Sequence, residues 1–264
     1  MRIGELALVN LAVISGAMLL LWLLSIPTRN ASIVDIFWGP AFALVALLGW
    51  FLGDGDPERR TLLAALTAAW GLRLGAYLAL RNLGQGEDPR YARWRRRVTE
   101  AGGNFTWQSL VLVFGLQALL VIIVSLPVQA GQLAVTGKSP GALALAGTLL
   151  WLTGFLFEAI GDWQLRQFKA DLANHGKVLD TGLWRYTRHP NYFGNACLWW
   201  GLWLVACDAP GLWWTAVGPV LMTVLLLRVS GVTLLERSLV ASNPGYAAYQ
   251  RRTSSFIPWP PRNS

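Results

Sequence analysis

Charged residues are scarce in this chain. They make up 14% of its 264 residues, against roughly 25% in a typical soluble domain, whereas 54% of the residues are hydrophobic and 15 are Trp. This composition excludes an ordinary soluble domain and indicates a membrane protein that is helical throughout, with no room for a separate soluble domain.

Several familiar site signatures are also missing. The sequence has no G-x-G-x-x-G fingerprint, no P-loop and no zinc-ligand spacing. The two cysteines, Cys197 and Cys207, have no Cys or His companion at metal-ligand spacing, so we expect two apolar thiols and no metal. Any nucleotide site must therefore be built in another way.

Apolar runs long enough to cross a bilayer recur from end to end, because about 20 helical residues span its core of roughly 30 Å. We expect an all-α domain over residues 1–264 with seven transmembrane helices, the first of them retained because it lacks the features of a cleaved signal peptide. The expected spans are Gly4–Ile26, Ile33–Leu52, Leu62–Leu83, Phe105–Val128, Ala142–Ile160, Tyr192–Ala206 and Trp213–Leu235.

The basic residues predict the orientation, since cytoplasmic loops are enriched in Lys and Arg. The segments after the third, fifth and seventh expected spans are rich in both, whereas the opposite side has only Arg2, the compensated DGDPERR loop and Lys138. We therefore expect the N-terminus outside and the C-terminus in the cytoplasm, and the net charge of +8 requires no nucleic acid.

Ionisable residues inside the spans point to a site, because each costs at least about 2.5 kcal/mol near the bilayer centre. In the third span Arg73, Tyr77 and Arg81 recur at every fourth position, with Trp70 one turn earlier. Arg81 can reach the interface by snorkelling. Arg73 is deeper, and we expect it to have an anionic partner, either Asp35 or a bound phosphate.

Asp35 lies just inside the second span, in the stretch NASIVDIFWGP. It is either an interfacial charge that pairs with Arg73, or an acid that polarises a carbonyl group in a cavity. Gly39 and Pro40 follow, and we expect them to open the helix locally and expose backbone groups.

The end of the fifth span, FEAIGDWQLRQFK, carries two acids followed by two bases on one helical face. Internal salt bridges are one interpretation. A nucleotide is the other, since carboxylates accept hydrogen bonds from ribose hydroxyls while cations bind phosphates. The four residues are Glu158, Asp162, Arg166 and Lys169.

The stretch LWRYTRHPNYFG concentrates cations at the start of an apolar helix, which is a favourable place to hold a phosphate. A cytoplasmic loop would explain Arg185 and Arg188, but it would not require the other polar residues of the cluster. Those residues are His189, Asn191 and Tyr192.

The C-terminal stretch LLERSLVASNPGYAAYQRRTSSFIPWPP has a turn at Asn243-Pro244-Gly245, followed by residues at helical spacing. It is either an amphipathic tail at the interface or a lid that folds back over the nucleotide. In the second interpretation Glu236 and Arg251 contribute to the cofactor site.

Together, GLWRYTRHPNYFGN and LLERSLVASNPGYAAYQRRTSSFIPW resemble the C-terminal half of the integral-membrane steroid 5-alpha-reductase family and its bacterial relatives. Isoprenylcysteine carboxyl methyltransferases share a version of this pattern. The resemblance covers residues 158–258 well, which would form the cofactor half. Before that it rests on hydropathy, on Arg73 and on the seven expected spans.

This resemblance implies reduction of a 3-oxo-Δ4-steroid by NADPH, with hydride going to C5 and a proton to C4. It also implies a multi-pass protein of a bacterial-type inner membrane, monomeric, with the cofactor site facing the cytoplasm and the apolar substrate entering from lipid. The residues that it places around the cofactor are Arg73, Glu158, Asp162, Arg166, Lys169, Lys177, Tyr186, Asn191 and Asn195.

The chain departs from the reductase pattern at several places. Trp38 and Trp70 stand where animal members have a Glu and a Tyr that polarise the steroid carbonyl, which makes both tryptophans candidate substrate contacts. Asp35 and Tyr77 are the nearby substitutes for the catalytic pair. Asn195 replaces a Glu that is common in the family.

Two other functions remain open. A membrane methyltransferase using S-adenosylmethionine shares part of the pattern, but that cofactor has no phosphate for the cations to bind. A lipid-binding or transport protein is the third interpretation, although no inverted repeat or pair of broken helices is evident.

Overall fold

The fold is described from a computed structural model, which covers residues 1–229, 236 and 245–262. The end of the expected seventh span and the predicted Asn243-Pro244 turn lie outside the described residues. Contacts within the chain divide it into two compact units, which are treated separately below. Unit 1 is Met1–Gly141 with Val205–Thr215, and unit 2 is Ala142–Leu204 with Ala216–Ser264.

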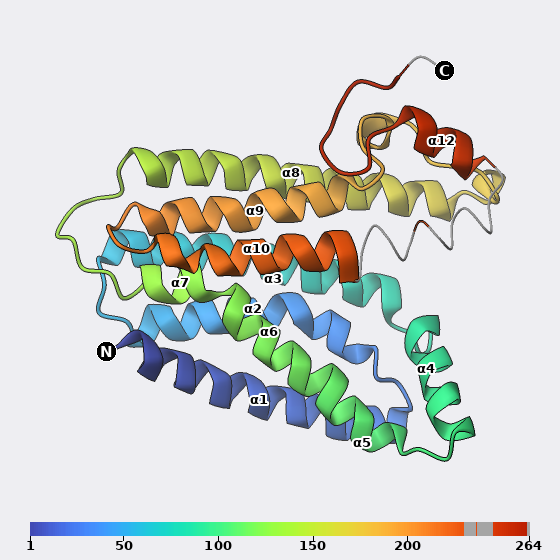
Figure 1. Ribbon diagram of the computed structural model, residues 1–264, viewed down its shortest axis with the longest axis horizontal. Coiled ribbons are helices and arrows are strands. Elements are labelled where there is room, and N and C mark those ends of the chain that lie inside the picture. Colours follow the sequence, from blue (N-terminus) through green and yellow to red (C-terminus); the bar gives the residue numbers. More distant parts are fainter. Residues whose placement is uncertain (230–235, 237–244, 263–264) are drawn as a thin grey trace. The chain divides into compact units, whose positions relative to one another are not determined.

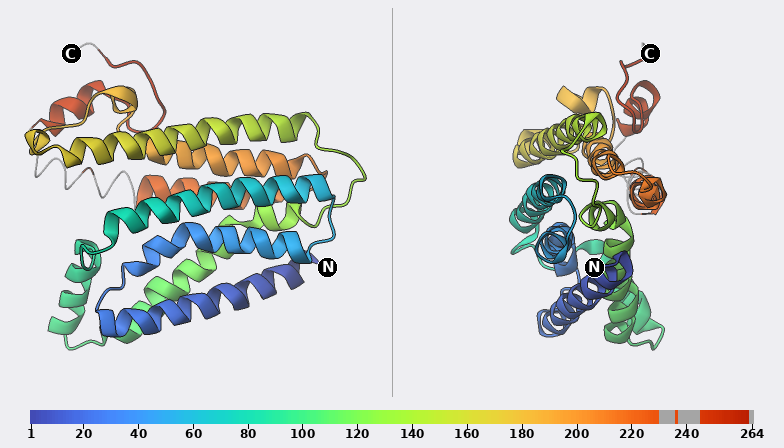
Figure 2. Two further views of the ribbon diagram at one scale, coloured as in Figure 1. Left: turned by 180° about the vertical axis from the view of Figure 1, so that it is seen from behind. Right: turned by 90° about the vertical axis from the view of Figure 1, so that its left-hand side faces the viewer.

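Unit 1 is built from helices joined by short connections (Figure 1). Three long helices come first, and α4 follows them as a short helix that runs across their direction in the views of Figures 1 and 2. The elements are α1 (Ile3–Thr28), α2 (Ile33–Leu52), α3 (Pro57–Asn82), α4 (Pro89–Glu100), α5 (Phe105–Ser109), the π-helical segment η1 (Leu110–Gly115), α6 (Leu116–Val124) and α7 (Leu126–Gly131).

Unit 2 contains a helical pair followed by shorter elements, and α9 continues for its last residues into unit 1. Its elements are α8 (Ala142–Ala170), the 3₁₀ turns η2 (Leu172–Asn174) and η3 (Gly182–Arg185), α9 (Pro190–Cys207), α10 (Val217–Val224), the π-helical segment η5 (Leu225–Val229) and α12 (Tyr246–Arg252). The 3₁₀ turn η4 (Trp213–Ala216) has only its last residue in unit 2.

Five helical stretches among the described residues are long and apolar enough to cross a membrane, which confirms the all-helical membrane protein that the composition predicts. They are α1, α2, α3, the continuous run Phe105–Val124 and α8. Trp213–Arg228 is apolar but shorter, and α9 has 18 residues. Among the described residues, length and composition therefore support five of the seven predicted spans.

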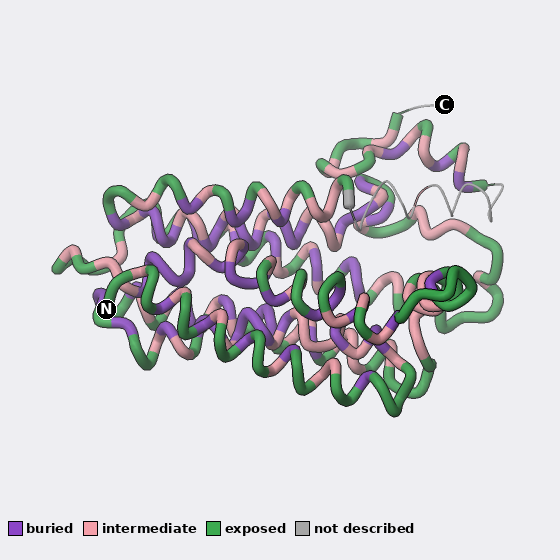
Figure 3. The backbone as a smooth tube through the Cα atoms, turned by 60° about the horizontal axis from the view of Figure 1, so that its bottom comes forward, coloured by how far each residue is buried: buried purple, intermediate pink, exposed green. Residues whose placement is uncertain are grey.

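The exposed surfaces of these helices are strongly apolar. In α1 the buried residues Leu6, Asn10, Ile14 and Met18 recur at every fourth position and form a narrow stripe. The other positions are largely exposed, as the green stretches along the tube from the N label show in Figure 3. A wide apolar surface with a narrow buried stripe suits a helix that faces lipid.

Glycine sets the closest helix contacts in unit 2. Gly147, Gly154 and Gly161 recur at every seventh position of α8, and Gly194 and Gly201 do the same in α9. A side chain at Gly154 would lie 2.5 Å from the Gly194 carbonyl oxygen, and one at Gly201 would lie 2.6 Å from that of Gly147. Small residues in this pattern let two membrane helices approach along their length.

In unit 1 the expected opening at Gly39 and Pro40 is wrong. α2 continues as a helix through Pro40, and Gly39 packs against the backbone of Gly71 in α3. A side chain at Gly75 would lie 2.6 Å from the Pro40 ring. This sequence feature serves close packing of α2 on α3, and the backbone groups there stay inside the helix.

The bounds of two expected spans also change. The fifth was expected to end at Ile160, but α8 continues to Ala170 because the acidic and basic face keeps its helical register beyond the apolar segment. The fourth was expected to reach Val128, but α6 ends at Val124. Ser125 then precedes α7, where Pro127 occupies one of the first two helical positions.

Candidate functional site

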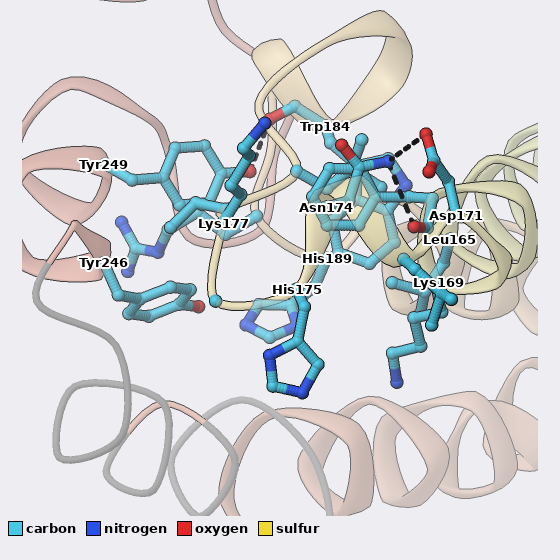
Figure 4. A pocket seen from close by; sticks show the side chains of 16 residues that line it. Leu165, Lys169, Asp171, Asn174, His175, Lys177, Trp184, His189, Tyr246 and Tyr249 are labelled. Atoms are coloured by element: carbon cyan, nitrogen blue, oxygen red, sulfur yellow. Dashed lines mark hydrogen bonds between the residues drawn. The ribbon is translucent and has the colours of Figure 1, made fainter.

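A cavity of about 310 Å³ opens in unit 2 (Figure 4). Its walls come from the end of α8, the loop that follows it, the segment between η3 and α9, and α12. The lining residues are Leu165, Phe168, Lys169, Asp171, Leu172, Asn174, His175, Gly176, Lys177, Val178, Leu179, Trp184, Arg188, His189, Tyr246 and Tyr249.

The loop after α8 is held in place by its own polar side chains. Asp171 accepts a hydrogen bond from the Ala173 backbone N–H at 2.9 Å, and the Asn174 amide donates to the Phe168 carbonyl at 3.2 Å. Gly176 has φ +76°, a conformation that favours glycine. These contacts fix a turn that carries His175 and Lys177 to the cavity.

The C-terminal tail folds back onto the segment before α9. The Arg188 N–H donates to the Ser254 carbonyl at 2.9 Å, and the Thr187 hydroxyl donates to the Phe256 carbonyl at 2.8 Å. The Tyr249 hydroxyl donates to the Trp184 carbonyl. The tail therefore forms part of the cavity wall, which favours the predicted lid over a detached interfacial tail.

Glu236 joins these two segments. Its carboxylate accepts from the Arg188 guanidinium at 2.7 and 3.1 Å, from the Gln250 amide at 2.9 Å, and lies 3.1 Å from His189 Nε2. Burial opposes ionisation, but the hydrogen bonds and charges of His189 and Arg188 outweigh it and lower the pKa of Glu236 to about 2. Protein side chains engage both carboxylate oxygens, so Glu236 holds the wall of the cavity together.

Glu158 and Asp162, the predicted acids of α8, contact residues of α9. The Asn195 amide donates to Glu158 at 3.1 Å, and the Asn191 amide donates to Asp162 at 3.1 Å. Both acids are buried, and Asn195 also has a buried side-chain oxygen with no hydrogen-bond partner among the described residues. These contacts join α8 to α9, and neither acid lines the cavity.

The next residue on this helical face differs from the two acids. Arg166 is exposed and makes no ion pair in the described part of the chain, so a row of salt bridges does not extend to it. Lys169, one turn further on, reaches the cavity. Of the two bases on this face, only Lys169 lines the cavity.

Four of the predicted cofactor residues line the cavity, namely Lys169, Lys177, Arg188 and His189. Tyr192 stacks on His189, with ring centroids 5.3 Å apart, but does not reach the cavity. The remaining predictions in unit 2 are exposed side chains outside the lining. They are Arg166, Arg185, Tyr186 and Arg251.

The predicted catalytic residues belong to unit 1, as does Arg73. Asp35 accepts from the Arg90 guanidinium at 3.1 Å and from the Tyr91 hydroxyl at 2.9 Å, both of α4. The expected pairing of Asp35 with Arg73 is therefore wrong. Helical spacing within α2 and α3 contains no information on the contacts that α4 makes with Asp35.

Aromatic rings surround the other unit 1 candidates. The guanidinium carbons of Arg73 and Arg81 lie 6.0 and 5.8 Å from the centre of the Tyr77 ring. Trp38 and Trp70 flank Phe42, with ring centroids 5.1 and 5.5 Å from it. Trp70 is almost fully buried and Trp38 is half-buried, so Trp38 is the more accessible of the two candidate substrate contacts.

Several cavity residues did not appear among the sequence candidates. Trp184, Tyr246 and Tyr249 supply its aromatic surface, while His175 and Asn174 belong to its loop. The spacing of Tyr246 and Tyr249 indicated a helix, but not the surface that it faces. Burial raises the pKa of both tyrosines, so their hydroxyls remain protonated hydrogen-bond donors at neutral pH.

The donor set suits an anionic ligand that contains aromatic rings. Lys169 and Lys177 supply positive charge, and the tyrosines and Trp184 supply ring surface. Asp171 supplies a carboxylate that can accept from hydroxyl groups. Phosphates, nucleobases and ribose hydroxyls all find complementary groups here, so the residues present fit a nucleotide cofactor.

Comparison with known proteins places this architecture in a family. The family described as "protein of unknown function (DUF1295)" matches residues 21–253, which include the cavity and the candidate acid of α2. An uncharacterized protein of Schizosaccharomyces pombe, C594.04c, is 26% identical over 264 residues, covering 90% of this chain and 75% of its own length. No solved structure matches the chain. Because the family match covers most of the sequence, the chain belongs to the DUF1295 family.

Proposed function

We propose that this protein is an NADPH-dependent reductase of the C4–C5 double bond of 3-oxo-Δ4-steroids, or of a similar apolar enone. In this proposal the protein spans a bacterial-type inner membrane seven times, with α9 and the α10–η5 stretch as the sixth and seventh spans. The N-terminus is outside, and the cavity faces the cytoplasm. The length of α9 supports the sixth of these spans, because its 18 residues extend over about 27 Å.

One observation carries the proposal. The two stretches that resemble the reductases are separated by some 40 residues, yet Trp184, Arg188 and His189 from one stretch and Tyr246 and Tyr249 from the other line the same cavity. The cavity also receives two lysines, from α8 and from the loop after it. A cation-rich cavity with aromatic walls supports a phosphate-bearing cofactor better than it supports a purely structural junction.

In this site Lys169 and Lys177 would bind the phosphates, while Tyr246, Tyr249 and Trp184 would position the cofactor rings. Asp171 would accept hydrogen bonds from ribose hydroxyls. Bound NADPH supplies the hydride for the reaction. Glu236 would act by fixing Arg188 and the tail, which keeps the cavity closed on the side of α12.

Polarisation of the substrate carbonyl is assigned to unit 1. A donor placed at the carbonyl oxygen stabilises the charge that develops there in the transition state. Asp35 already accepts from Arg90 and Tyr91, so it acts in this proposal as an acceptor. The donor role then falls to Tyr77, and Trp38 provides apolar surface for the substrate.

Methyl transfer from S-adenosylmethionine is the alternative, and the small volume of the cavity favours it. The cavity lies near the lower limit of the roughly 300–1,000 Å³ common for ligand sites. Its four aromatic side chains, from Phe168, Trp184, Tyr246 and Tyr249, would suit a sulfonium, which rings attract through cation–π interactions. The two lysines argue the other way, because this cofactor carries no phosphate.

The reaction is tested directly by isotope transfer. Purified protein in lipid nanodiscs is incubated with a 3-oxo-Δ4-steroid and NADPH that carries deuterium at C4, separately on each face. The proposal expects the steroid product to gain one deuterium at C5 and one solvent hydrogen at C4, with deuterium from one face only. A methylated product from S-adenosylmethionine, with no reduction in parallel assays, would assign the alternative.

A further inference from the structure

The α4 helix at one end of unit 1 carries two different faces. One face is fixed to its own unit: Arg90 and Tyr91 bind Asp35, and Arg95 pairs with Glu87 at 2.7 Å. The Trp94 ring packs edge-on against Phe105, with centroids 4.9 Å apart. This face accounts for how the helix is held in position.

The other face is basic and exposed. Arg93, Arg96 and Arg97 are spaced by three and one residues, which places them on one side of the helix. Among the described residues, none of the three side chains makes an ion pair or a hydrogen bond. Glu100, one turn further on, is the only acid of the helix. A concentrated positive charge is therefore presented outward.

The surroundings of α4 place it at the level of a membrane interface. Leu80 and Leu83, at the end of α3, are 69% and 68% exposed, and Trp107, in α5, is 63% exposed. Exposed leucines at the end of a spanning helix suit lipid, and Trp is enriched where lipid tails meet headgroups. Figures 1 and 2 show α4 running across the direction of α1, α2 and α3, as a helix lying in the interface would.

We propose that α4 binds anionic phospholipid headgroups through Arg93, Arg96 and Arg97. Guanidinium groups bind phosphate oxygens with paired hydrogen bonds, and a negatively charged leaflet concentrates such partners beside a basic helix. Each arginine near the surface favours an anionic lipid by about fivefold, so the three together favour it by about a hundredfold. The helix then anchors the end of unit 1 to the headgroup layer.

This inference is independent of the proposed reductase reaction, because it concerns a face that holds neither the cavity nor the candidate acid. It has structural consequences for α2, however, since Arg90 and Tyr91 of the same helix bind Asp35. Lipid that holds α4 in place would also hold these two contacts.

Native mass spectrometry of the full-length protein released from mixed micelles tests the proposal. Phosphatidylglycerol and phosphatidylcholine of the same chain length are present in equal amounts, and bound lipids are counted. The expected result is a clear excess of bound phosphatidylglycerol. The variant Arg93→Gln/Arg96→Gln/Arg97→Gln should lose most of that excess, and the corresponding triple Lys variant should keep much of it.

Control variants distinguish lipid binding at α4 from a general effect of positive charge on the protein. Arg2→Gln/Lys138→Gln removes two exposed cations from elsewhere in unit 1 and should leave lipid binding unchanged. Thermal unfolding of each variant in detergent checks that it is folded. The proposal is overturned if the wild-type protein shows no preference for phosphatidylglycerol, or if the folded triple Gln variant retains it. Loss of NADPH binding with unchanged lipid binding would assign the three arginines to the cofactor instead.

Discussion

The Arg-rich end of unit 1 and the cavity end of unit 2 use charge in different ways. In unit 1, Asp35 and Arg90 form an interhelical pair whose side chains are 20% and 55% exposed. In unit 2, Glu236 and Arg188 form a pair whose side chains are only 14% and 10% exposed. Water screens the first pair more than the second because Arg90 is exposed, so similar chemistry should have unequal effects on stability.

The largest effect is expected from breaking the buried pair. Glu236→Ala would leave Arg188 and the almost fully buried His189 without their carboxylate, and removal of one partner of a buried ion pair costs about 3–5 kcal/mol. Thermal and denaturant unfolding in detergent measure the loss. Glu236→Gln, which keeps the shape and one acceptor, should lose less. Equal stability of Glu236→Ala and wild type would contradict the described role of Glu236.

The amide contacts between α8 and α9 should come next. Asn195→Ala removes a hydrogen bond to the buried Glu158 carboxylate, and hydrogen bonds to charged groups contribute about 1.5–3 kcal/mol. Asn174→Ala, which loses contacts in the partly exposed loop, is the matched control and should cost less. The same unfolding measurements apply. A larger loss for the loop variant would reverse the order expected from burial.

Lowering the pH should reveal how much Glu236 contributes to stability. Its ordinary pKa is 4.5 and its folded-state pKa is about 2, so the stabilisation is fully present above pH 4.5 and is lost as the pH falls toward 2. The unfolding midpoint should decline across this window, with a shallower decline in Glu236→Gln. Asp56, whose ordinary pKa of 3.8 is lowered to about 2 mainly by hydrogen bonding to Thr136, contributes a parallel decline in both proteins. Identical pH profiles would show that Glu236 is not the group responsible.

The pair of unit 1, in which only Arg90 is exposed, should have the smallest effect on stability. Asp35→Asn should lower the free energy of unfolding by less than Glu236→Ala does, because the Arg90 partner is exposed to water. Under the proposed function it should nevertheless reduce turnover strongly while leaving NADPH binding unchanged. Steroid reduction assays and cofactor titration of the same preparation measure both. Retained turnover would remove Asp35 from the proposed mechanism.

Much of the helical framework could be predicted from the sequence. Apolar runs identified α1, α2, α3, the Phe105–Val124 stretch and α8, because the length and polarity of a spanning helix are encoded locally. The same patterns could not establish α9 or the last apolar stretch as spans. Glycine at every seventh position of α8 and α9 indicates that the two helices pack closely. A hydropathy pattern alone does not reveal this spacing.

The candidate site was predictable only in part. The cations Lys169, Lys177 and Arg188 were found because charge beside an apolar helix is conspicuous in sequence. The pairings of Asp35 with Tyr91 and of Glu236 with His189 join residues about 50 positions apart, and helical spacing contains no information on such contacts. The aromatic wall formed by Tyr246 and Tyr249 depends in the same way on how the tail folds back.

Equilibrium binding of cofactors is the most direct test that the cavity of unit 2 is a reductase site. NADPH, NADH and S-adenosylmethionine are titrated into protein in nanodiscs, together with Lys169→Ala, Lys177→Ala and the cavity-remote Lys138→Ala. The proposal predicts tightest binding of NADPH, weakened about tenfold or more by each cavity variant and unchanged by the control, since each lost charge-assisted contact contributes about 1.5–3 kcal/mol. Preferential binding of S-adenosylmethionine, or NADPH binding that neither cavity lysine affects, would contradict it.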